Sequence, residues 1–120
     1  MSTADELLQR ATEVRADAVR HLTALAGDAS MCAIGRSGRS FPAAKYHEGR
    51  QSGATDARRA LRREPTDAAV DGVLEDVRQR WQQTLSDAEA KGPDWVAYAT
   101  GGLDALAEIT AALRPSNPQQ

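Results

Sequence analysis

The residues best suited to chemistry lie in a basic segment near the middle of the chain. Residues 35–50 read GRSGRSFPAAKYHEGR, and a helix is expected to begin just after Ser40. Free N–H groups at a helix start attract anions, and guanidinium groups bind phosphate or carboxylate through two hydrogen bonds. The segment is therefore a candidate site for an anionic ligand, which would be a phosphorylated small molecule, a nucleotide or nucleic acid. Its candidate residues are Arg36, Arg39, Ser40, Lys45, Tyr46, His47 and Arg50. The simpler interpretation, which we prefer, is a polar loop whose arginines pair with acids of the first or third helix.

A second basic feature is a stripe of four arginines further along the same segment. On a helix, residues four apart lie on one face, so these side chains form one exposed row. The stripe consists of Arg58, Arg59, Arg62 and Arg63. Such a row can follow a phosphate backbone, or it can pair with an acidic helix of the same chain. The following segment offers Asp67, Asp71, Glu75 and Asp76.

The distribution of charge favours internal pairing of this stripe. Residues 31–65 carry a net charge of +5, whereas residues 1–30 carry −2 and residues 66–120 carry −5. A compact fold of so short a chain brings at least one acidic flank beside the basic middle. We therefore expect the stripe to dock on the acidic third helix rather than on nucleic acid.

Signatures of catalysis and of metal binding are nearly absent. The chain has two histidines, His21 and His47, and one cysteine, Cys32. His47–Glu48 is followed by Gly, Arg and Gln, so it does not match the HExxH zinc motif. Cys32 with His47 as a base is conceivable, but a buried inert thiol is the simpler interpretation. The sequence predicts no catalytic residues, no metal and no cofactor.

The spacing of apolar residues predicts an all-α fold, a small bundle of about four helices. Apolar side chains recur every three or four residues in segments 3–26, 67–91 and 94–113, and a further helix is expected from Ser40 to Arg63. A polar Gly/Arg/Ser-rich insertion at 27–40 separates the first two helices, with a short hairpin as one possibility. Gly49, Gly53 and Ala57 either form a close helix contact or mark a break in the second helix.

Length and composition limit the organisation of the chain. A chain of 120 residues gives one helical domain, expected over residues 1–114, with a disordered polar tail at 115–120. Ala contributes 23 residues, whereas Leu, Ile, Val and Phe together contribute 19, so the core should be thin. Thin Ala-rich helices gain apolar burial by pairing with a second copy, which predicts a homodimer.

The same composition leads to expectations about location and function. A lone cysteine, a charged N-terminal region and the lack of a long apolar run predict a cytoplasmic protein without a membrane span. Thirteen arginines against two lysines, with abundant Ala, suggest a GC-rich bacterial genome. The preferred hypothesis is a non-enzymatic interaction or regulatory module whose partner is a second copy or another protein. The alternative is a binder of an anionic ligand through residues 35–63.

Overall fold

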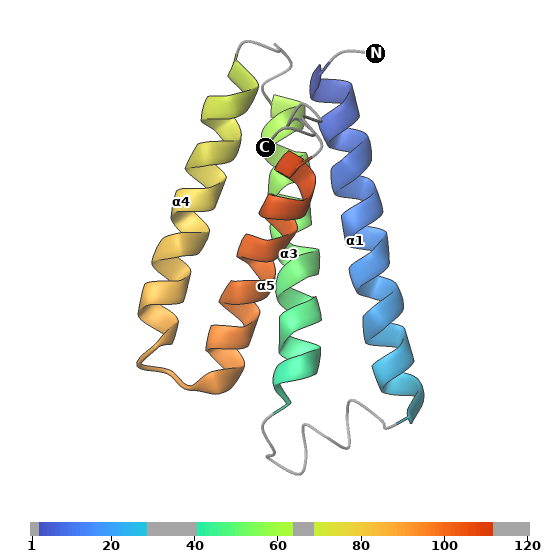
Figure 1. Ribbon diagram of the computed structural model, residues 1–120, viewed down its shortest axis with the longest axis vertical. Helices are drawn as coiled ribbons and strands as arrows, with labels where there is room; N and C mark the ends of the chain where they lie inside the picture. The colour runs from blue at the N-terminus through green and yellow to red at the C-terminus, as the bar shows by residue number, and fades with distance from the viewer. Residues whose placement is uncertain (1–2, 29–40, 64–68, 112–120) are drawn as a thin grey trace, which may run out of the picture.

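The computed structural model describes residues 3–28, 41–63 and 69–111. These residues form four helices and no strand, which confirms the predicted all-α bundle (Figure 1). The helices are α1 (Thr3–Asp28), α3 (Pro42–Arg63), α4 (Val70–Ala88) and α5 (Pro93–Thr110). The predicted hairpin and the predicted polar tail lie outside the described residues. None of the described helices is long and apolar enough to span a membrane.

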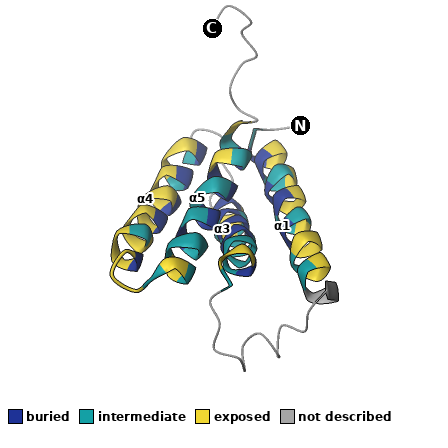
Figure 2. Cartoon of the chain, turned by 60° about the horizontal axis from the view of Figure 1, so that its bottom comes forward, coloured by how far each residue is buried: buried dark blue, intermediate teal, exposed yellow. Residues whose placement is uncertain are grey.

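Helix α3 occupies the centre of the bundle. It packs against α1, α4 and α5, while α5 also contacts α4 and, to a lesser extent, α1. Figure 1 shows α5 in front of α3, with α4 and α1 on either side, and Figure 2 shows the buried faces turned towards α3. This arrangement leaves one groove between α1 and α5 and another between α4 and α5.

The core is built largely from small side chains, as the composition predicts. The largest fully buried side chains are Leu7, Leu61, Ile109, Val70 and Val77. They are joined by buried alanines that include Ala11, Ala54, Ala57 and Ala105. Because alanine projects little beyond the backbone, these positions let the helix axes approach closely.

The two tryptophans lie in different environments. Trp81 is buried, and its indole Nε1 donates a hydrogen bond of 3.0 Å to Asp56 Oδ2. Trp95 is 46% exposed and is not part of the core. Trp95 lies instead against Tyr98 and beneath the ammonium group of Lys45.

Glycines set the distance between α3 and α5. A Cβ atom at Gly49 would overlap the backbone carbonyl oxygen of Tyr98, and one at Gly101 would overlap that of Tyr46. Gly53 meets the backbone of Gly102 in the same way. The helices are continuous at these positions, so the small residues serve close packing, and the alternative of a break in the second helix is excluded.

Some helix ends differ from the sequence-based expectations. The helix expected over residues 3–26 continues through Gly27 to Asp28. Aspartate favours the N-cap, so Asp94 is the residue type expected to cap the last helix, but α5 begins at Pro93, with Gly92 at the N-cap and φ 116°. The Asp94 carboxylate accepts a hydrogen bond of 3.0 Å from the backbone N–H of Phe41 at the start of α3. A contact distant in sequence thus replaces the expected local cap.

Candidate functional site

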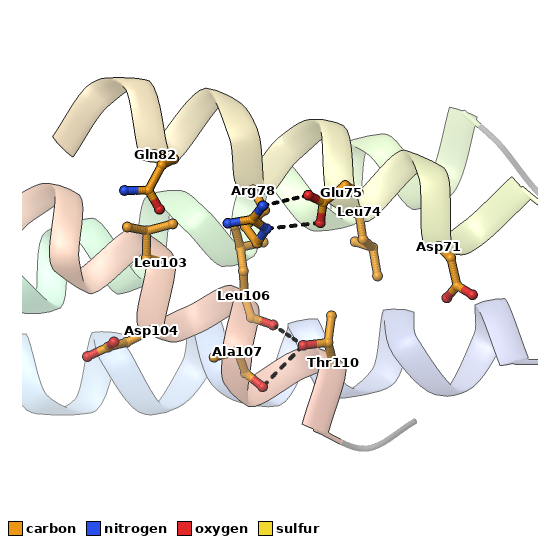
Figure 3. Close-up of a pocket in the computed structure, with 10 residues that line it drawn as sticks. All are labelled: Asp71, Leu74, Glu75, Arg78, Gln82, Leu103, Asp104, Leu106, Ala107 and Thr110. Carbon is orange, nitrogen blue, oxygen red and sulfur yellow. Dashed lines mark hydrogen bonds and ion pairs between the residues drawn. The ribbon is translucent and has the colours of Figure 1, made fainter. Parts of the chain in front are cut away.

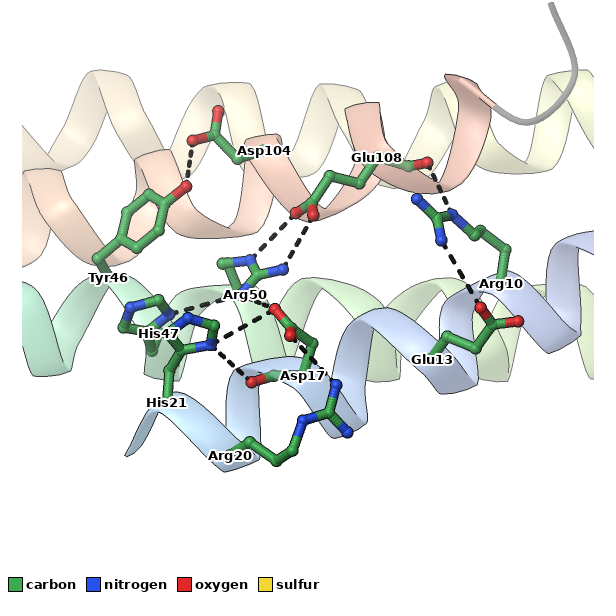
Figure 4. A network of polar contacts seen from close by, with 10 residues as sticks. All are labelled: Arg10, Glu13, Asp17, Arg20, His21, Tyr46, His47, Arg50, Asp104 and Glu108. Atoms are coloured by element: carbon green, nitrogen blue, oxygen red, sulfur yellow. Dashed lines mark hydrogen bonds and ion pairs between the residues drawn. The ribbon is translucent and has the colours of Figure 1, made fainter. Parts of the chain in front are cut away.

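A network of charged and aromatic side chains fills the groove between α1 and α5, with Arg50 of α3 at its centre (Figure 4). The Arg50 side chain is only 7% exposed. Its Nη1 lies 2.9 Å from Asp17 Oδ2 of α1. Its Nη2 and Nε donate to the two carboxylate oxygens of Glu108 of α5, at 2.9 and 3.0 Å. One guanidinium therefore joins three helices.

The electrostatics of this cluster follow from burial and pairing. The hydrogen bond from Arg50 holds the pKa of the Asp17 carboxyl below its usual range. Burial acts to lower the pKa of Arg50, but the hydrogen bonds with Glu108 and Asp17 outweigh burial and raise it. A buried charge is tolerated when its partners replace the lost hydration, and here two carboxylates do so.

Two histidines extend the network towards the C-terminal half of α1. The rings of His21 and His47 stack, with centroids 4.5 Å apart and an interplanar angle of 14°. His47 Nδ1 lies 3.5 Å from Arg50 Nη1 and acts as the acceptor, since arginine only donates. Burial lowers the pKa of His47, and the nearby charges of His21 and Arg50 lower it further. A neutral His47 is therefore the form that suits this position.

Tyr46 forms the other arm of the network. Its hydroxyl donates a hydrogen bond of 2.5 Å to Asp104 Oδ2 of α5. Burial raises the pKa of Tyr46 to about 12, and the hydrogen bond and negative charge of Asp104 act in the same direction. The phenol therefore remains protonated well above the ordinary tyrosine range.

This raised pKa makes the stability depend on pH in alkaline solution. The folded state retains a proton that the unfolded state releases near pH 10, so the stability gained from this proton is present below pH 10. It should be lost as the pH rises from about 10 towards about 12. The check is ultraviolet titration of the wild type and of Tyr46→Phe, whose difference curve isolates Tyr46. A midpoint near 10 would contradict the buried hydrogen bond.

The chemistry open to this network is limited by how fully its groups are engaged. Both carboxylates around Arg50 are occupied by the guanidinium, so an anionic ligand there would have to displace Asp17 or Glu108. Among the described residues, no group of three or more potential metal ligands comes together. The arrangement is that of a polar clamp that fixes α1 and α5 to α3.

The structure describes four of the seven residues of the predicted anion site, and one of these, Lys45, has partners of its own. Lys45 Nζ lies 3.0 Å from Glu48 Oε2 and 5.3 Å from the centroid of the Trp95 ring. Tyr46, His47 and Arg50 do come together, but around carboxylates of the same chain. Arg36, Arg39 and Ser40 lie outside the described residues, so the anion site as a whole stays a prediction.

Sequence reasoning missed the acids that complete the network, which are Asp17, Asp104 and Glu108. The usable signal was spacing: Asp17 and His21 are four residues apart on α1, as are Asp104 and Glu108 on α5. Each pair therefore lies on one helix face. Nothing local indicates that both faces turn towards Arg50.

The arginine stripe is not neutralised by any described acid. Arg59, Arg62 and Arg63 are exposed and Arg58 is partly buried, and no ion pair within the described ranges involves them. The expected docking of the stripe on the acidic third helix is therefore absent there, and Asp67 is outside the described residues. The two described acids of α3 have other partners: Glu48 pairs with Lys45, and Asp56 accepts from Trp81.

Arg58 is the stripe residue whose side chain most clearly lacks a hydrogen-bond partner. Its Nε is buried from solvent and makes no hydrogen bond within the described structure. Burial lowers the pKa of Arg58, and the positive charges of Arg62 and of Arg15 on α1 lower it further. The stripe is thus a patch of like charge with an unsatisfied donor at its edge.

A second groove runs between α4 and α5 (Figure 3). It encloses about 660 Å³, with Leu74, Leu103 and Leu106 among its lining residues. Asp71 and Glu75 contribute carboxylates to the same groove, and its one cation, Arg78, pairs with Glu75 on its own helix. Asp104 also lines the groove, with its carboxylate accepting the hydrogen bond from Tyr46. The groove is therefore apolar at its base and acidic at its edge.

Comparisons of the chain with protein-family models, with curated proteins and with solved structures find no match.

Proposed function

We propose that this chain is a non-enzymatic interaction module that binds an acidic protein surface through the basic stripe, Arg58, Arg59, Arg62 and Arg63. One observation carries the proposal. Lys45 and Arg50 have acidic partners within the chain, whereas the stripe has none among the described residues. Positive charge at the end of α3 is stabilised modestly by the helix dipole, but the dipole does not satisfy the buried Nε of Arg58.

Carboxylates are the partner groups that fit this surface best. Arginine presents a planar fork of donors that matches a carboxylate at two points. A carboxylate from a partner could approach Arg58 and Arg62 together, because the two side chains share one face of α3. Such an approach would also relieve the repulsion among Arg58, Arg62 and Arg15.

Nucleic acid fits the same surface less well. The stripe spans only six residues of helix, about 7.5 Å along the axis, so it reaches few phosphates. No aromatic residue is interleaved with its arginines to stack on a base. The exposed acids Asp71 and Asp76 of α4, a helix that packs on α3, would oppose a polyanion that extends beyond the stripe.

The proposal predicts selective binding of an acidic helix. A fluorescent peptide with glutamates four residues apart should bind the wild-type chain at low salt. Arg58→Gln/Arg62→Gln should bind it about tenfold more weakly, because two exposed charge pairs are lost. Fluorescence anisotropy measures both affinities.

A matched variant separates the stripe from net charge. Arg80→Gln/Lys91→Gln removes two exposed positive charges outside the stripe and should leave the affinity for the peptide nearly unchanged. Equal losses in the two double variants would show nonspecific attraction and overturn the proposal. A labelled DNA duplex tests nucleic acid as the alternative partner. Tighter binding of the duplex than of the peptide would also overturn the proposal.

A further inference from the structure

We infer that the acidic surface bound by the basic stripe is a second copy of this chain, and that its acidic groove receives Arg58 and Arg62. The acidic groove is the groove between α4 and α5, with Asp71, Glu75 and Asp104 at its edge. This inference rests on the proposed function and names the partner.

The two surfaces carry net charges of opposite sign within the described chain. The stripe has four cations without a paired acid. The groove has three carboxylates and one cation, Arg78, whose pair with Glu75 lies within one exposed helix turn. Such a pair contributes little to stability, so an incoming guanidinium can share Glu75 with Arg78.

The spacing of the charges also matches. Arg58 and Arg62 are four residues apart on α3, and Asp71 and Glu75 are four residues apart on α4. Four residues of helix rise about 6 Å, so two helices lying side by side bring both pairs into register. The methylene stems of the arginines can then cover the exposed Ala107 and the half-buried Leu103 in the same groove.

The two surfaces cannot meet within one molecule. Gly49 and Gly53 face α5, and by helical periodicity Arg58 and Arg62 lie roughly half a turn away around α3. The acidic groove is on the α5 side of the molecule, where α5 lies in front of α3 (Figure 1). Contact between copies is therefore head-to-tail, which extends to further copies rather than closing into a symmetric pair.

The small amount of exposed apolar surface also favours association through charge. Among the described large apolar side chains, only Val19 and Trp95 are classed as exposed. Since an apolar interface needs a broad hydrophobic patch, charge is the better-provided basis for association of this chain.

Sedimentation velocity on the wild-type chain gives the first test. At low salt the mean mass should rise with concentration and pass beyond that of a dimer. High salt shortens the range of these charge interactions and should weaken the association about tenfold. A wild-type chain that stays monomeric at low salt and high concentration would overturn the inference.

Complementation between two variants is the sharper test. Arg58→Gln/Arg62→Gln lacks a working stripe, and Asp71→Asn/Glu75→Gln lacks a working groove. Each should remain monomeric alone. An equimolar mixture should form a dimer and nothing larger, because only one productive contact remains. A mixture that stays monomeric, or a groove variant that associates like the wild type, would contradict the inference.

Matched controls and the acidic peptide complete the design. Asp76→Asn/Glu89→Gln removes two exposed acids outside the groove and should associate like the wild type. If the wild type is monomeric but still binds the acidic peptide through its stripe, the self-association fails and the proposed function stands. If the wild type neither self-associates nor binds the acidic peptide, both the inference and the proposed function fail.

Discussion

Replacing Gly49 with alanine should destabilise the fold by about 3 kcal/mol or more, the upper end of the effect of overpacking. The added methyl group would overlap the backbone carbonyl oxygen of Tyr98. A side chain can change rotamer to relieve such a contact, but a backbone oxygen of α5 moves only if the helix moves. Relief therefore requires α3 and α5 to separate along their closest contact. Urea unfolding measures the change.

Gly72→Ala provides the matched control. Gly72 lies within α4, is exposed, and a Cβ atom there would meet nothing within 4 Å. The same substitution should stabilise the chain at this position by up to about 1 kcal/mol, because alanine restricts the unfolded chain and favours helix. The two Gly→Ala substitutions should thus change the free energy of unfolding in opposite directions. Gly49→Ala with wild-type stability would show that α3 and α5 are further apart than described.

Removing both carboxylate partners of Arg50 should have the second-largest effect. Asp17→Asn/Glu108→Gln leaves a guanidinium that is 7% exposed without a counterion. Breaking a buried pair in this way costs about 3–5 kcal/mol. Because Asp17 and Glu108 are 36% and 38% exposed, solvent screens part of the interaction, and we expect about 3 kcal/mol. Urea unfolding near neutral pH is the measurement.

Two further variants test the cause of that loss. Adding Arg50→Met to the double variant removes the stranded charge and should recover at least half of the lost stability. Asp76→Asn/Glu89→Gln, which removes two exposed acids elsewhere, should change stability by no more than about 0.5 kcal/mol. If adding Arg50→Met restores nothing, the guanidinium is not the source of the instability.

The helices could be predicted from sequence because their signals are local. Apolar spacing places α1, α4 and α5, and the helix expected just after Ser40 begins at Pro42 in the structure. The errors occur where a distant contact replaces a local rule. Aspartate is a residue type that favours helix N-caps, yet the Asp94 carboxylate accepts a hydrogen bond from the Phe41 N–H at the start of α3.

The glycines of α3 show the same limit. Helix propensity alone counts Gly49 and Gly53 as weak points, and this left a broken helix as an equal alternative. The close approach of α5 decides between the alternatives, and it depends on Gly101 and Gly102 about fifty residues later.

The candidate sites were predictable in residue type but not in partners. Tyr46, His47 and Arg50 were selected for their chemistry, but their partners Asp17, Asp104 and Glu108 come from two other helices. The stripe shows the converse case. The net charges of the flanks favoured internal pairing, but those acids of α4 within the described residues make no ion pair with it. The net charge of a flank gives its excess of acids, but it does not show which basic residue each acid contacts.

The central claim is that the stripe has no acidic partner among the described residues and is available to an acidic surface of another molecule. Its most direct test is the free energy of unfolding of Arg58→Gln/Arg62→Gln, measured with dilute protein at low salt. We expect no loss of stability, and a gain of a few tenths of a kcal/mol as repulsion among Arg15, Arg58 and Arg62 is relieved. A loss of about 1 kcal/mol or more that disappears at high salt would contradict the claim, since it would show that the stripe is already paired within its own chain.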